Sequence, residues 1–383
     1  MTKLEQLIEE LCPNGVEFKK IKDVFQRLKG TPITAGKMKE IENPNGEIKI
    51  FAGGKTVINA NEADIPNANI TRVPAVLVQS RGVIDVVYYE KPFTFKNEMW
   101  AYITDNKTTV KYLYYVLKNN IQQFRDAASG MGSLPQISLP VTEEFYVPIP
   151  PLPVQSEIVR ILDNFTELTA ELTAELTAEL TARKKQYEYY RDFLFATAKG
   201  KVNTTLDKIA ENCDSQRKPV ASGKREAGNI PYYGASGIVD YVKEYIFDGD
   251  YLLVSEDGAN LLARSTPIAF SISGKTWVNN HAHILKFEEY ATRRYVEIYL
   301  NSIDLSYYIT GGAQPKLNQK NLNKIEIPLP PLDEQKRIVE ILDRFDSLCN
   351  DISAGLPAEI EARQKQYEYY RDKLLTFKEL IAN

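Results

Sequence analysis

His281 and His283 are the only histidines of the chain and stand two residues apart in WVNNHAHILKF. On a β-strand, side chains at this spacing point to the same face, where two imidazoles can begin a metal site. No third ligand is evident from the sequence, and no cysteine lies nearby. We therefore expect no bound metal and interpret the pair as structural, hydrogen-bonding or ligand-contacting histidines.

Asp333, Glu334 and Lys336 form a D-E-x-K triplet, a pattern found in nuclease active sites. The triplet directly follows the Pro-rich stretch IPLPPL, where a helix is expected to begin. At such a position Asp caps the first turn, and Glu interacts favourably with the helix dipole. We therefore interpret the triplet as a helix start and expect no nuclease site.

Motifs of common catalytic sites are absent from the sequence. It has no Walker loop, no GxSxG and no HExxH, and it lacks the (Asp/Asn)-Pro-Pro-(Tyr/Phe) motif of a methyltransferase. The glycines of FAGG at 51–54 are typical of a turn. Cys12, Cys213 and Cys349 lie far apart without a CxxC spacing, which argues against disulfides and zinc sites and fits the cytoplasm. We expect a protein without catalytic activity, cofactor or metal.

The charges of the chain are nearly balanced. It carries 47 Lys and Arg against 51 Asp and Glu, a net charge of −4. The acidic excess lies in residues 151–200 and 331–383. No segment is basic enough to hold nucleic acid by charge alone, so binding to DNA would require a partner for part of the phosphate contact. The apolar runs are strand-sized, and no membrane span is expected.

Two segments of the sequence repeat at an offset of 180 residues. VPIPPLPVQSEIVRILDNF at 147–165 aligns with IPLPPLDEQKRIVEILDRF at 327–345. The motif KQYEYYRD at 185–192 recurs unchanged at 365–372. An internal repeat of this kind predicts that one architectural unit is built twice.

Each copy predicts a long amphipathic helix, because its apolar residues recur at spacings of three and four. These apolar positions correspond between the copies, as in Leu168 and Leu348. In the first copy, the words Thr-Ala-Glu-Leu occur three times between residues 169 and 180. Two long helices with one apolar stripe each predict an antiparallel coiled coil. Gly355 and Pro357 predict a break or kink in the second copy.

The segments between the helices are rich in β-branched and aromatic runs, punctuated by Gly, Asn and Pro. They also echo each other, as PAVLVQSRG at 74–82 echoes DYLLVSEDG at 250–258. We predict an α+β fold with a pseudo-twofold internal repeat, in which two globular α/β domains are separated by two long antiparallel helices. The expected boundaries are 1–150, 151–199, 200–330 and 331–383. A helix at 2–11 is expected to pack near the end of the C-terminal helix.

This layout resembles the specificity (S) subunit of type I restriction–modification systems over essentially the whole chain. The resemblance rests on EQKRIVEILDRF, the paired KQYEYYRD, WVNNHAHILKF and GGAQPKLNQKNL, and the TAEL words point to the type IC branch. It implies two target recognition domains that each read half of a split DNA site. It also implies a non-catalytic subunit that binds double-stranded DNA, two methyltransferase (M) subunits and, in some complexes, restriction (R) subunits.

The four-residue TAEL unit has a geometric meaning in this context. Four residues at about 100° each turn a helix by about 40° net and lengthen it by about 6 Å. B-DNA turns by about 34–36° per base pair. We therefore interpret the repeat as a ruler in which one added unit rotates one globule by about one base-pair step. The alternative to a ruler is that the repeat only forms a stable helix, because Ala, Glu and Leu are strong helix formers.

Candidate DNA contacts are polar residues at loops that follow the predicted strands, because Arg and Lys suit guanine and Asn and Gln suit adenine. In the first domain they are Gln79, Ser80, Arg81, Ser129 and Ser133. In the second they are Ser255, Asp257, Arg264, His281, Gln314, Lys316, Asn318 and Lys320. The alternative interpretation of each residue is that it lies in a solvent-exposed turn without a DNA contact.

Candidate partner contacts lie in the duplicated KQYEYYRD motif, because two unchanged copies are expected to meet the same kind of protein. They are Gln186, Tyr187, Tyr189, Tyr190, Arg191, Gln366, Tyr367, Tyr369, Tyr370 and Arg371. Packing of the two helices against each other is the alternative use of these residues. For the whole chain, the competing hypothesis is a coiled-coil protein-interaction scaffold without a DNA role, which the near-neutral charge favours.

Overall fold

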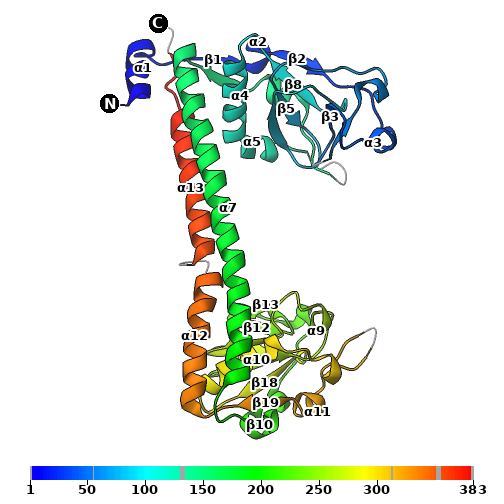
Figure 1. Cartoon of the computed structure of the whole chain (residues 1–383), viewed down its shortest axis with the longest axis vertical. Helices are drawn as coiled ribbons and strands as arrows, with labels where there is room; N and C mark the ends of the chain where they lie inside the picture. The colour runs from blue at the N-terminus through cyan, green and yellow to red at the C-terminus, as the bar shows by residue number, and fades with distance from the viewer. Residues whose placement is uncertain (1, 55, 130–133, 312–313, 351–354, 381–383) are drawn as a thin grey trace. The chain divides into compact units, whose positions relative to one another are not determined.

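The computed structural model describes residues 2–54, 56–129, 134–311, 314–350 and 355–380. The chain forms two compact units (Figure 1): unit 1 comprises Met1–Glu175 and Ile360–Asn383, and unit 2 comprises Leu176–Glu359. Each unit contains one globule with its own hydrophobic core and segments of two long helices. No helix among the described residues is both long and apolar enough to span a membrane.

The globule of unit 1 is built on a four-stranded antiparallel sheet. Its order is β2 (Gln26–Lys29), β8 (Trp100–Ile103), β5 (Ala75–Gln79) and β6 (Asp85–Tyr89). Every residue of β5 is buried, because helix α4 (Lys107–Asn119) covers one face and a smaller sheet covers the other. Val76 and Val78 pack with Val116 of α4, whereas Leu77 packs with Phe93 of the smaller sheet. This alternation is the period of two expected of a strand between two layers.

The smaller sheet of unit 1 has the order β4 (Val57–Ala60), β3 (Ile48–Phe51) and β7 (Phe93–Phe95), with β3 and β7 parallel. A two-stranded sheet of β1 (Glu17–Lys20) and β9 (Tyr146–Ile149) joins the beginning and end of the globule. The remaining helices of the globule are α1 (Lys3–Leu11), α2 (Ile21–Val24), α3 (Ala35–Ile41), α5 (Ile121–Asp126) and α6 (Leu139–Glu143).

The globule of unit 2 repeats this topology. Its main sheet has the order β11 (Glu211–Asn212), β18 (Ala282–Lys286), β15 (Tyr251–Ser255) and β16 (Ala269–Ile272), with α10 (Tyr290–Ser302) on one face. Leu252 and Val254 pack with Tyr295 of α10, and Leu253 packs on the opposite face. The strands β5 and β15 therefore occupy the same place in both units, as the echo between 74–82 and 250–258 predicts.

The second sheet of unit 2 has the order β13 (Gly237–Val242), β12 (Ala227–Gly234), β17 (Lys275–Val278) and β14 (Phe247–Asp248). Its strands β12 and β17 are parallel, like β3 and β7 in unit 1. The other elements are β10 (Val202–Thr205), β19 (Glu326–Leu329), α8 (Leu206–Ile209), α9 (Asn260–Ala263) and α11 (Gln319–Leu322).

The predicted long helices are α7 (Leu152–Thr197), α12 (Leu332–Asn350) and α13 (Leu356–Leu375). In unit 1 the first part of α7 lies beside α13, with 5.9 Å between the ring centroids of Phe165 and Tyr370. In unit 2 the rest of α7 lies beside α12, with 5.8 Å between the rings of Tyr190 and Phe345. The predicted antiparallel pairing is confirmed within each unit. Gly355 is not helical and α13 begins only at Leu356, which confirms the predicted break near Gly355.

One part of the coiled-coil prediction is wrong. Leu168 and Leu348, expected in the buried stripe, are 59% and 40% exposed. The four-residue spacing explains this, because each step of four drifts by about 40° around the helix. Leu172 is half-buried and Leu176 is buried, so the Leu positions turn gradually toward the interior along α7.

The two ends of the chain meet in unit 1. The backbone N–H of Val16 donates to Lys378 O at 2.9 Å, and the N–H of Leu380 donates to Val16 O at 2.8 Å. Leu4 of α1 and Leu375 of α13 belong to the same core cluster. The expected packing of the N-terminal helix near the C-terminal helix is therefore confirmed.

Candidate nucleic-acid interface

In unit 1, the turn after β5 is joined to a second loop at Arg81 and Gln136. The two residues are directly opposed in an antiparallel bridge. Backbone hydrogen bonds flank the pair, from Ile137 to Ser80 (2.9 Å) and from Gly82 to Pro135 (2.8 Å). Pairs flanked in this way have the closest side chains in an antiparallel ladder, with Cα atoms about 4.5 Å apart. Arg81 and Gln136 therefore emerge side by side.

Ser129 extends this pair to a row of three. Its N–H donates to Gln136 O at 2.9 Å, and the N–H of Gln136 donates back to Ser129 O at 3.4 Å. Because directly opposed residues of antiparallel segments face the same side, Ser129, Gln136 and Arg81 share one face. We call these three residues the first row. All three are exposed.

Unit 2 contains the same arrangement with different side chains. Asp257 opposes Lys316, and Lys316 opposes Thr310. The flanking backbone bonds run from Leu317 to Glu256 (2.8 Å) and from Gly258 to Pro315 (3.2 Å), and Thr310 and Lys316 exchange two bonds of 2.8 and 2.7 Å. We call Thr310, Lys316 and Asp257 the second row.

A glycine follows the first residue of the turn in both units. Gly82 has φ +80° and Gly258 has φ +102°. Residues other than glycine avoid this left-handed region, so a glycine is needed for the chain to leave the strand at this angle.

The two rows differ in how their charges are satisfied. The Arg81 guanidinium and the Gln136 amide make no hydrogen bond or ion pair with another residue in the described part of the chain. By contrast, Lys316 Nζ lies 3.0 Å from Glu256 Oε1, and Asp257 lies 2.8 Å from His281 Nδ1. The side chains of Arg81 and Gln136 in the first row thus have no polar partner among the described residues, whereas the charges of the second row already have partners.

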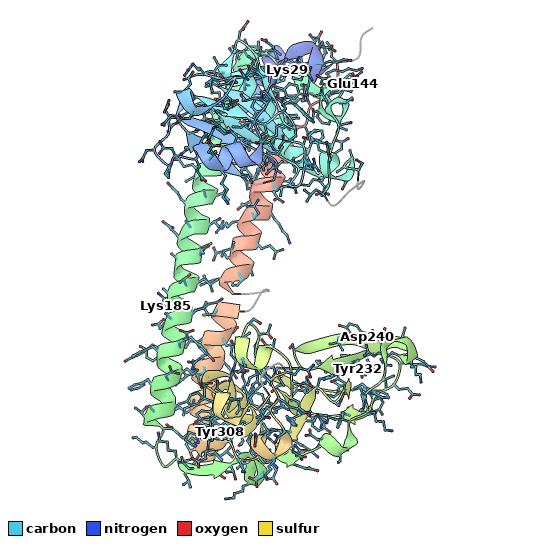
Figure 2. All side chains as sticks on the ribbon, turned by 90° about the vertical axis from the view of Figure 1, so that its right-hand side faces the viewer. Lys29, Glu144, Lys185, Tyr232, Asp240 and Tyr308 are labelled. Carbon is cyan, nitrogen blue, oxygen red and sulfur yellow. The ribbon has the colours of Figure 1, made fainter. Side chains whose placement is uncertain are left out.

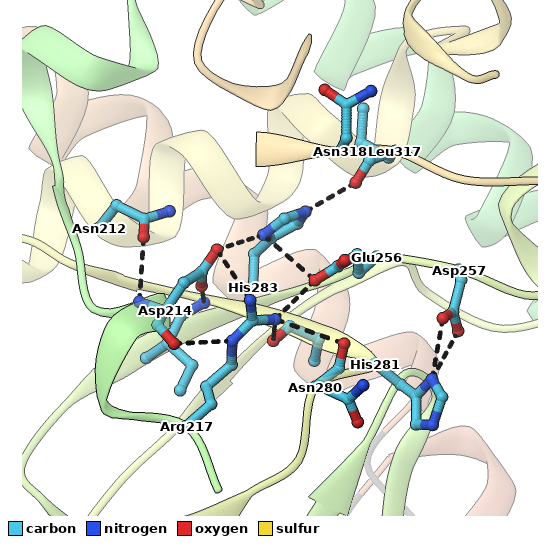
Figure 3. Close-up of polar contacts among 12 residues, drawn as sticks. Asn212, Asp214, Arg217, Glu256, Asp257, Asn280, His281, His283, Leu317 and Asn318 are labelled. Carbon is cyan, nitrogen blue, oxygen red and sulfur yellow. Dashed lines mark hydrogen bonds and ion pairs between the residues drawn. The ribbon is translucent and has the colours of Figure 1, made fainter. Parts of the chain in front are cut away.

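His283 anchors the loop of the second row to the main sheet of unit 2 (Figure 3). Its Nδ1 lies 2.6 Å from Asp214 Oδ2, and its Nε2 lies 2.7 Å from Leu317 O. Both ring nitrogens therefore face oxygen atoms, the Asp214 carboxylate on one side and the Leu317 carbonyl on the other. Arg217 completes the cluster by binding Glu256 at 2.6 Å. The loop is therefore held by charge-assisted hydrogen bonds as well as by its backbone ladder.

The carboxyl groups of this cluster are stabilised in their charged form. Burial by itself raises the pKa of Asp214, but the hydrogen bond from His283 and the charge of Arg217 lower the pKa more. The pKa of Glu256 is raised by burial and lowered more strongly by Arg217 and Lys316. Both pKa values therefore lie below the usual range of their side chains.

Asp214, Glu256 and His283 also have the ligand types of a metal site, and their ligand atoms lie within 4.8 Å of one another. The sequence alone shows no third ligand, because Asp214 is 69 residues away from His283. However, the basic side chains of Arg217 and Lys316 already neutralise these carboxylates. A cation would have to displace them, so the arrangement is that of a salt-bridge cluster.

Comparisons with known proteins agree with this duplicated layout. The sequence profile of the Type I restriction modification DNA specificity domain matches residues 13–182 and 199–362. The chain belongs to this family. It is a DNA specificity subunit, a class that is not enzymatic because catalysis lies in the other subunits of the system.

The similar proteins carry the same designation. A type I restriction enzyme specificity subunit of Escherichia coli is 38% identical over 302 residues, which cover 71% of this chain and 72% of that protein. A putative specificity subunit of Haemophilus influenzae is 40% identical over 179 residues, but the match spans only 46% of its length.

Solved structures share the fold at low sequence identity. The S subunit from M. genitalium has a TM-score of 0.51 and 18% identity, covering 94% of this chain and 96% of its own. A chain from a study of assembly of the type I R-M system has a TM-score of 0.64 and 14% identity, covering 95% and 98%.

Several predicted DNA contacts of the specificity subunit are not at its surface. Gln79, Ser80 and Ser255 are buried, and the hydroxyls of the two serines donate to backbone carbonyls of Glu98 and Ala235. We correct the prediction for these three, because a side chain at the end of a central strand can point into the protein instead of out of the loop. Ser133 lies outside the described residues.

Arg264 and Asn318 have structural roles in unit 2. Arg264 has φ +50°, and its guanidinium donates to the carbonyls of Leu300 and Ile303 at the end of α10 and just beyond it. Burial lowers the pKa of this guanidinium. Asn318 caps α11 by accepting from Asn321 N–H at 2.9 Å. Gln314, Lys320 and His281 remain exposed.

Arg81 also lines a cleft of about 780 Å³ beside the smaller sheet of unit 1. Lys96 and Glu98, an ion pair of 2.9 Å, lie on the same cleft wall. Residues of α3 and β4 line the same cleft as Arg81. The sequence does not predict that these elements lie near Arg81.

The KQYEYYRD motifs serve the packing of the helices in both units. Tyr367 OH lies 3.0 Å from Thr166 Oγ1, and Tyr187 packs into the core of unit 2. Arg371 donates to Asn119 at 2.9 Å, which ties α13 to α4. The alternative use of these residues, packing of the helices, therefore exists within each unit.

The same motifs also leave tyrosine side chains largely exposed in both units. Tyr189 and Tyr369 are 66% and 63% exposed. Lys185, the first residue of the motif on α7, is exposed as well (Figure 2). The other predicted partner contacts Gln186, Gln366 and Arg191 bind neighbours on their own helix at Arg183, Arg363 and Asp192.

Proposed function

We propose that this specificity subunit reads a split DNA site, with one half read by each unit. The observation that carries the proposal is the pair of rows. The backbone places Arg81, Gln136 and Ser129 in unit 1 as it places Asp257, Lys316 and Thr310 in unit 2. Different hydrogen-bonding groups on the same frame are what reading two different half-sites requires.

The boundaries expected from the sequence separate the proposed recognition domains from the proposed spacer. Residues 1–150 and 200–330 are proposed as the two target recognition domains. Residues 151–199 and 331–383 are proposed as the spacer, which includes α7, α12 and α13.

The TAEL words are proposed as a ruler of the type IC kind. They lie entirely within α7, so each unit of four residues contributes about 40° of rotation and about 6 Å of length. The length exceeds one base-pair step, and a helix inclined to the DNA axis projects less. The proposal therefore predicts that the unread gap changes by one base pair for each unit.

Methyltransferase subunits are proposed to dock at Tyr189 and Tyr369, and restriction subunits to join them in the complete complex. The two tyrosines occupy the same position in unchanged copies of one motif. Two identical partners need two identical contact surfaces, and exposed aromatic side chains are common anchors of such surfaces. The partner also supplies phosphate contacts that the near-neutral recognition domains lack.

The test is a map of modified adenines in cells that carry this chain with its methyltransferase partner. The chain is compared with a variant that lacks residues 173–176, which are one TAEL unit. A split motif whose halves persist while the gap shortens by one base pair supports both the reading role and the ruler. Thr173→Ala is the matched control, because it alters the same unit without changing its length.

The other outcomes separate the parts of the proposal. A split motif with an unchanged gap would keep the reading role and reduce the TAEL run to a helix. No split motif from a folded complex would contradict the reading of two half-sites.

A further inference from the structure

We propose that the first row reads purines in the major groove, with Arg81 bound to a guanine and Gln136 to a neighbouring adenine. This inference rests on the proposed function and names the bases that unit 1 recognises. The sequence alone does not single out Gln136. It emerges only because the backbone ladder places it opposite Arg81.

The spacing of the two side chains fits neighbouring base pairs. Arg81 and Gln136 form the close pair of the ladder, so their Cβ atoms are about 4.5–5.5 Å apart. Consecutive base pairs rise by about 3.4 Å. Two long, flexible side chains that start at this separation can converge on adjacent bases.

The shape of the element that carries them also suits the major groove. Residues 80–82 and 135–137 form two backbone segments joined by reciprocal hydrogen bonds. The major groove admits a two-stranded β-ribbon, and base edges there distinguish all four base pairs. The row therefore stands on an element of suitable width.

Both side chains are available to a ligand. Arg81 and Gln136 are exposed and, within the described residues, their polar groups have no protein partner to give up. The buried hydroxyl of Ser80 and the Arg264 guanidinium, by contrast, are already committed to backbone carbonyls.

The row is preorganised by groups that do not read bases. Its frame uses main-chain hydrogen bonds, and it continues the fully buried strand β5. The Arg81 carbonyl also accepts from Gly54 N–H at 3.0 Å, which connects the turn to the smaller sheet. Side chains on a fixed frame lose less freedom on binding, so more of their contact energy is available for discrimination.

The chemistry assigns the bases. An Arg guanidinium donates two parallel hydrogen bonds to O6 and N7 of guanine, and a Gln amide both donates to and accepts from the edge of adenine. In the second row, Asp257 occupies the position of Arg81 and Lys316 occupies the position of Gln136. It therefore reads a different half-site.

The experiment uses the complete chain co-purified with its methyltransferase partner. The wild-type motif is first mapped from modified adenines, and duplexes of that sequence then serve as probes. Gln136→Ala is expected to relax one adenine of the first half-site and to weaken binding to the mapped duplex by about 10- to 100-fold. Arg81→Ala removes the guanidinium and is expected to relax one guanine of the same half-site.

A variant that changes the preferred base is a more stringent test than one that loses it. Gln136→Lys introduces the residue that the second row carries on the same frame, so folding is expected to be preserved. It should change the preferred base at that position from adenine to guanine. Gln123→Ala on α5, also exposed, is the matched control and should leave the motif unchanged.

Two outcomes would overturn the inference. The motif of the first half-site could stay unchanged in all three variants, or both half-sites could weaken equally. A split motif from the wild-type complex in the same experiment would leave the proposed function intact, so the two failures are distinguishable.

Discussion

Lys111 of α4 forms an ion pair with Asp163 of α7, with 2.8 Å between Nζ and Oδ2. Tyr115 of α4 donates a hydrogen bond to the same carboxylate at 2.5 Å. In unit 2, Arg294 of α10 binds Asp343 of α12 at 2.7 Å. Asp163 and Asp343 occupy the same position in the repeated segment. Each globule is thus tied to a spacer helix through one repeated carboxylate.

We expect Asp163→Ala to lower the free energy of unfolding by about 1 kcal/mol, because it removes a half-exposed ion pair and one tyrosine hydrogen bond. Urea unfolding measures the loss, and hydrogen exchange should show it in α4. Asp105→Ala, an exposed carboxylate before α4, should have no comparable effect. Equal destabilisation by both substitutions would contradict the role of the repeated carboxylate.

Gln155 and Gln335 tie the Pro-rich segments to the helices that follow them. Each buried amide donates to a proline carbonyl at 2.7 Å, Gln155 to Pro150 and Gln335 to Pro330. Substitution of either by Ala leaves a buried carbonyl without its donor, which costs about 1–3 kcal/mol. Chemical denaturation should show this loss for both variants, while Gln122→Ala on the surface of α5 should show almost none.

The charge cluster of unit 2 predicts a dependence of stability on pH. The lowered pKa values of Asp214 and Glu256 contribute stability above their unfolded pKa values of about 4. This contribution is lost as the pH falls through the folded pKa values, because the folded state then takes up the protons that the unfolded state already holds. We expect Asp214→Asn to destabilise the protein by about 2 kcal/mol at pH 7.

The comparison of pH 7 with pH 3 tests this prediction. Thermal unfolding should show a smaller difference between the wild type and Asp214→Asn at pH 3. A difference that is as large at pH 3 as at pH 7 would mean that shape, and not charge, explains the effect of the substitution.

The exposed tyrosines predict where the methyltransferase subunit binds. We expect Tyr189→Ala and Tyr369→Ala each to weaken one of two docking events, and the double variant to weaken both by about 2 kcal/mol each. Analytical ultracentrifugation of mixtures with the partner measures the assembled species. Tyr307→Ala is the control, because Tyr307 is 92% exposed and does not belong to either copy of the motif. If it reduces assembly as much as the motif variants, the docking surface is assigned wrongly.

The sequence predicts the architecture well because the repeat carries it. The offset of 180 residues identifies the two long helical segments, and weak echoes between the globules align β5 with β15. The sequence also predicts candidate contacts in both loops of each row, at Arg81 and Ser129 in unit 1 and at Asp257 and Lys316 in unit 2. What links them residue by residue is a backbone ladder, which leaves no signature in the side chains. For this reason the sequence does not single out Gln136 and Thr310.

Burial at the ends of strands is less predictable. Ser80 and Ser255 are polar residues of the kind found in loops, but both side chains are buried. The His283 cluster draws Asp214 from a segment 69 residues away, and no periodicity connects the two. Leu168 belongs to an apolar stripe in the sequence, yet the drift of a four-residue period carries it to the surface.

The main-chain frame of the two rows has a consequence for how this protein changes over generations. The backbone bonds that fix Arg81, Gln136 and Ser129 join peptide groups, so these bonds persist when the side chains are replaced. If these positions read bases as proposed, substitutions there are expected to alter what is recognised at little cost in folding. A lineage can explore new target sequences one residue at a time while its scaffold stays under unchanged selection.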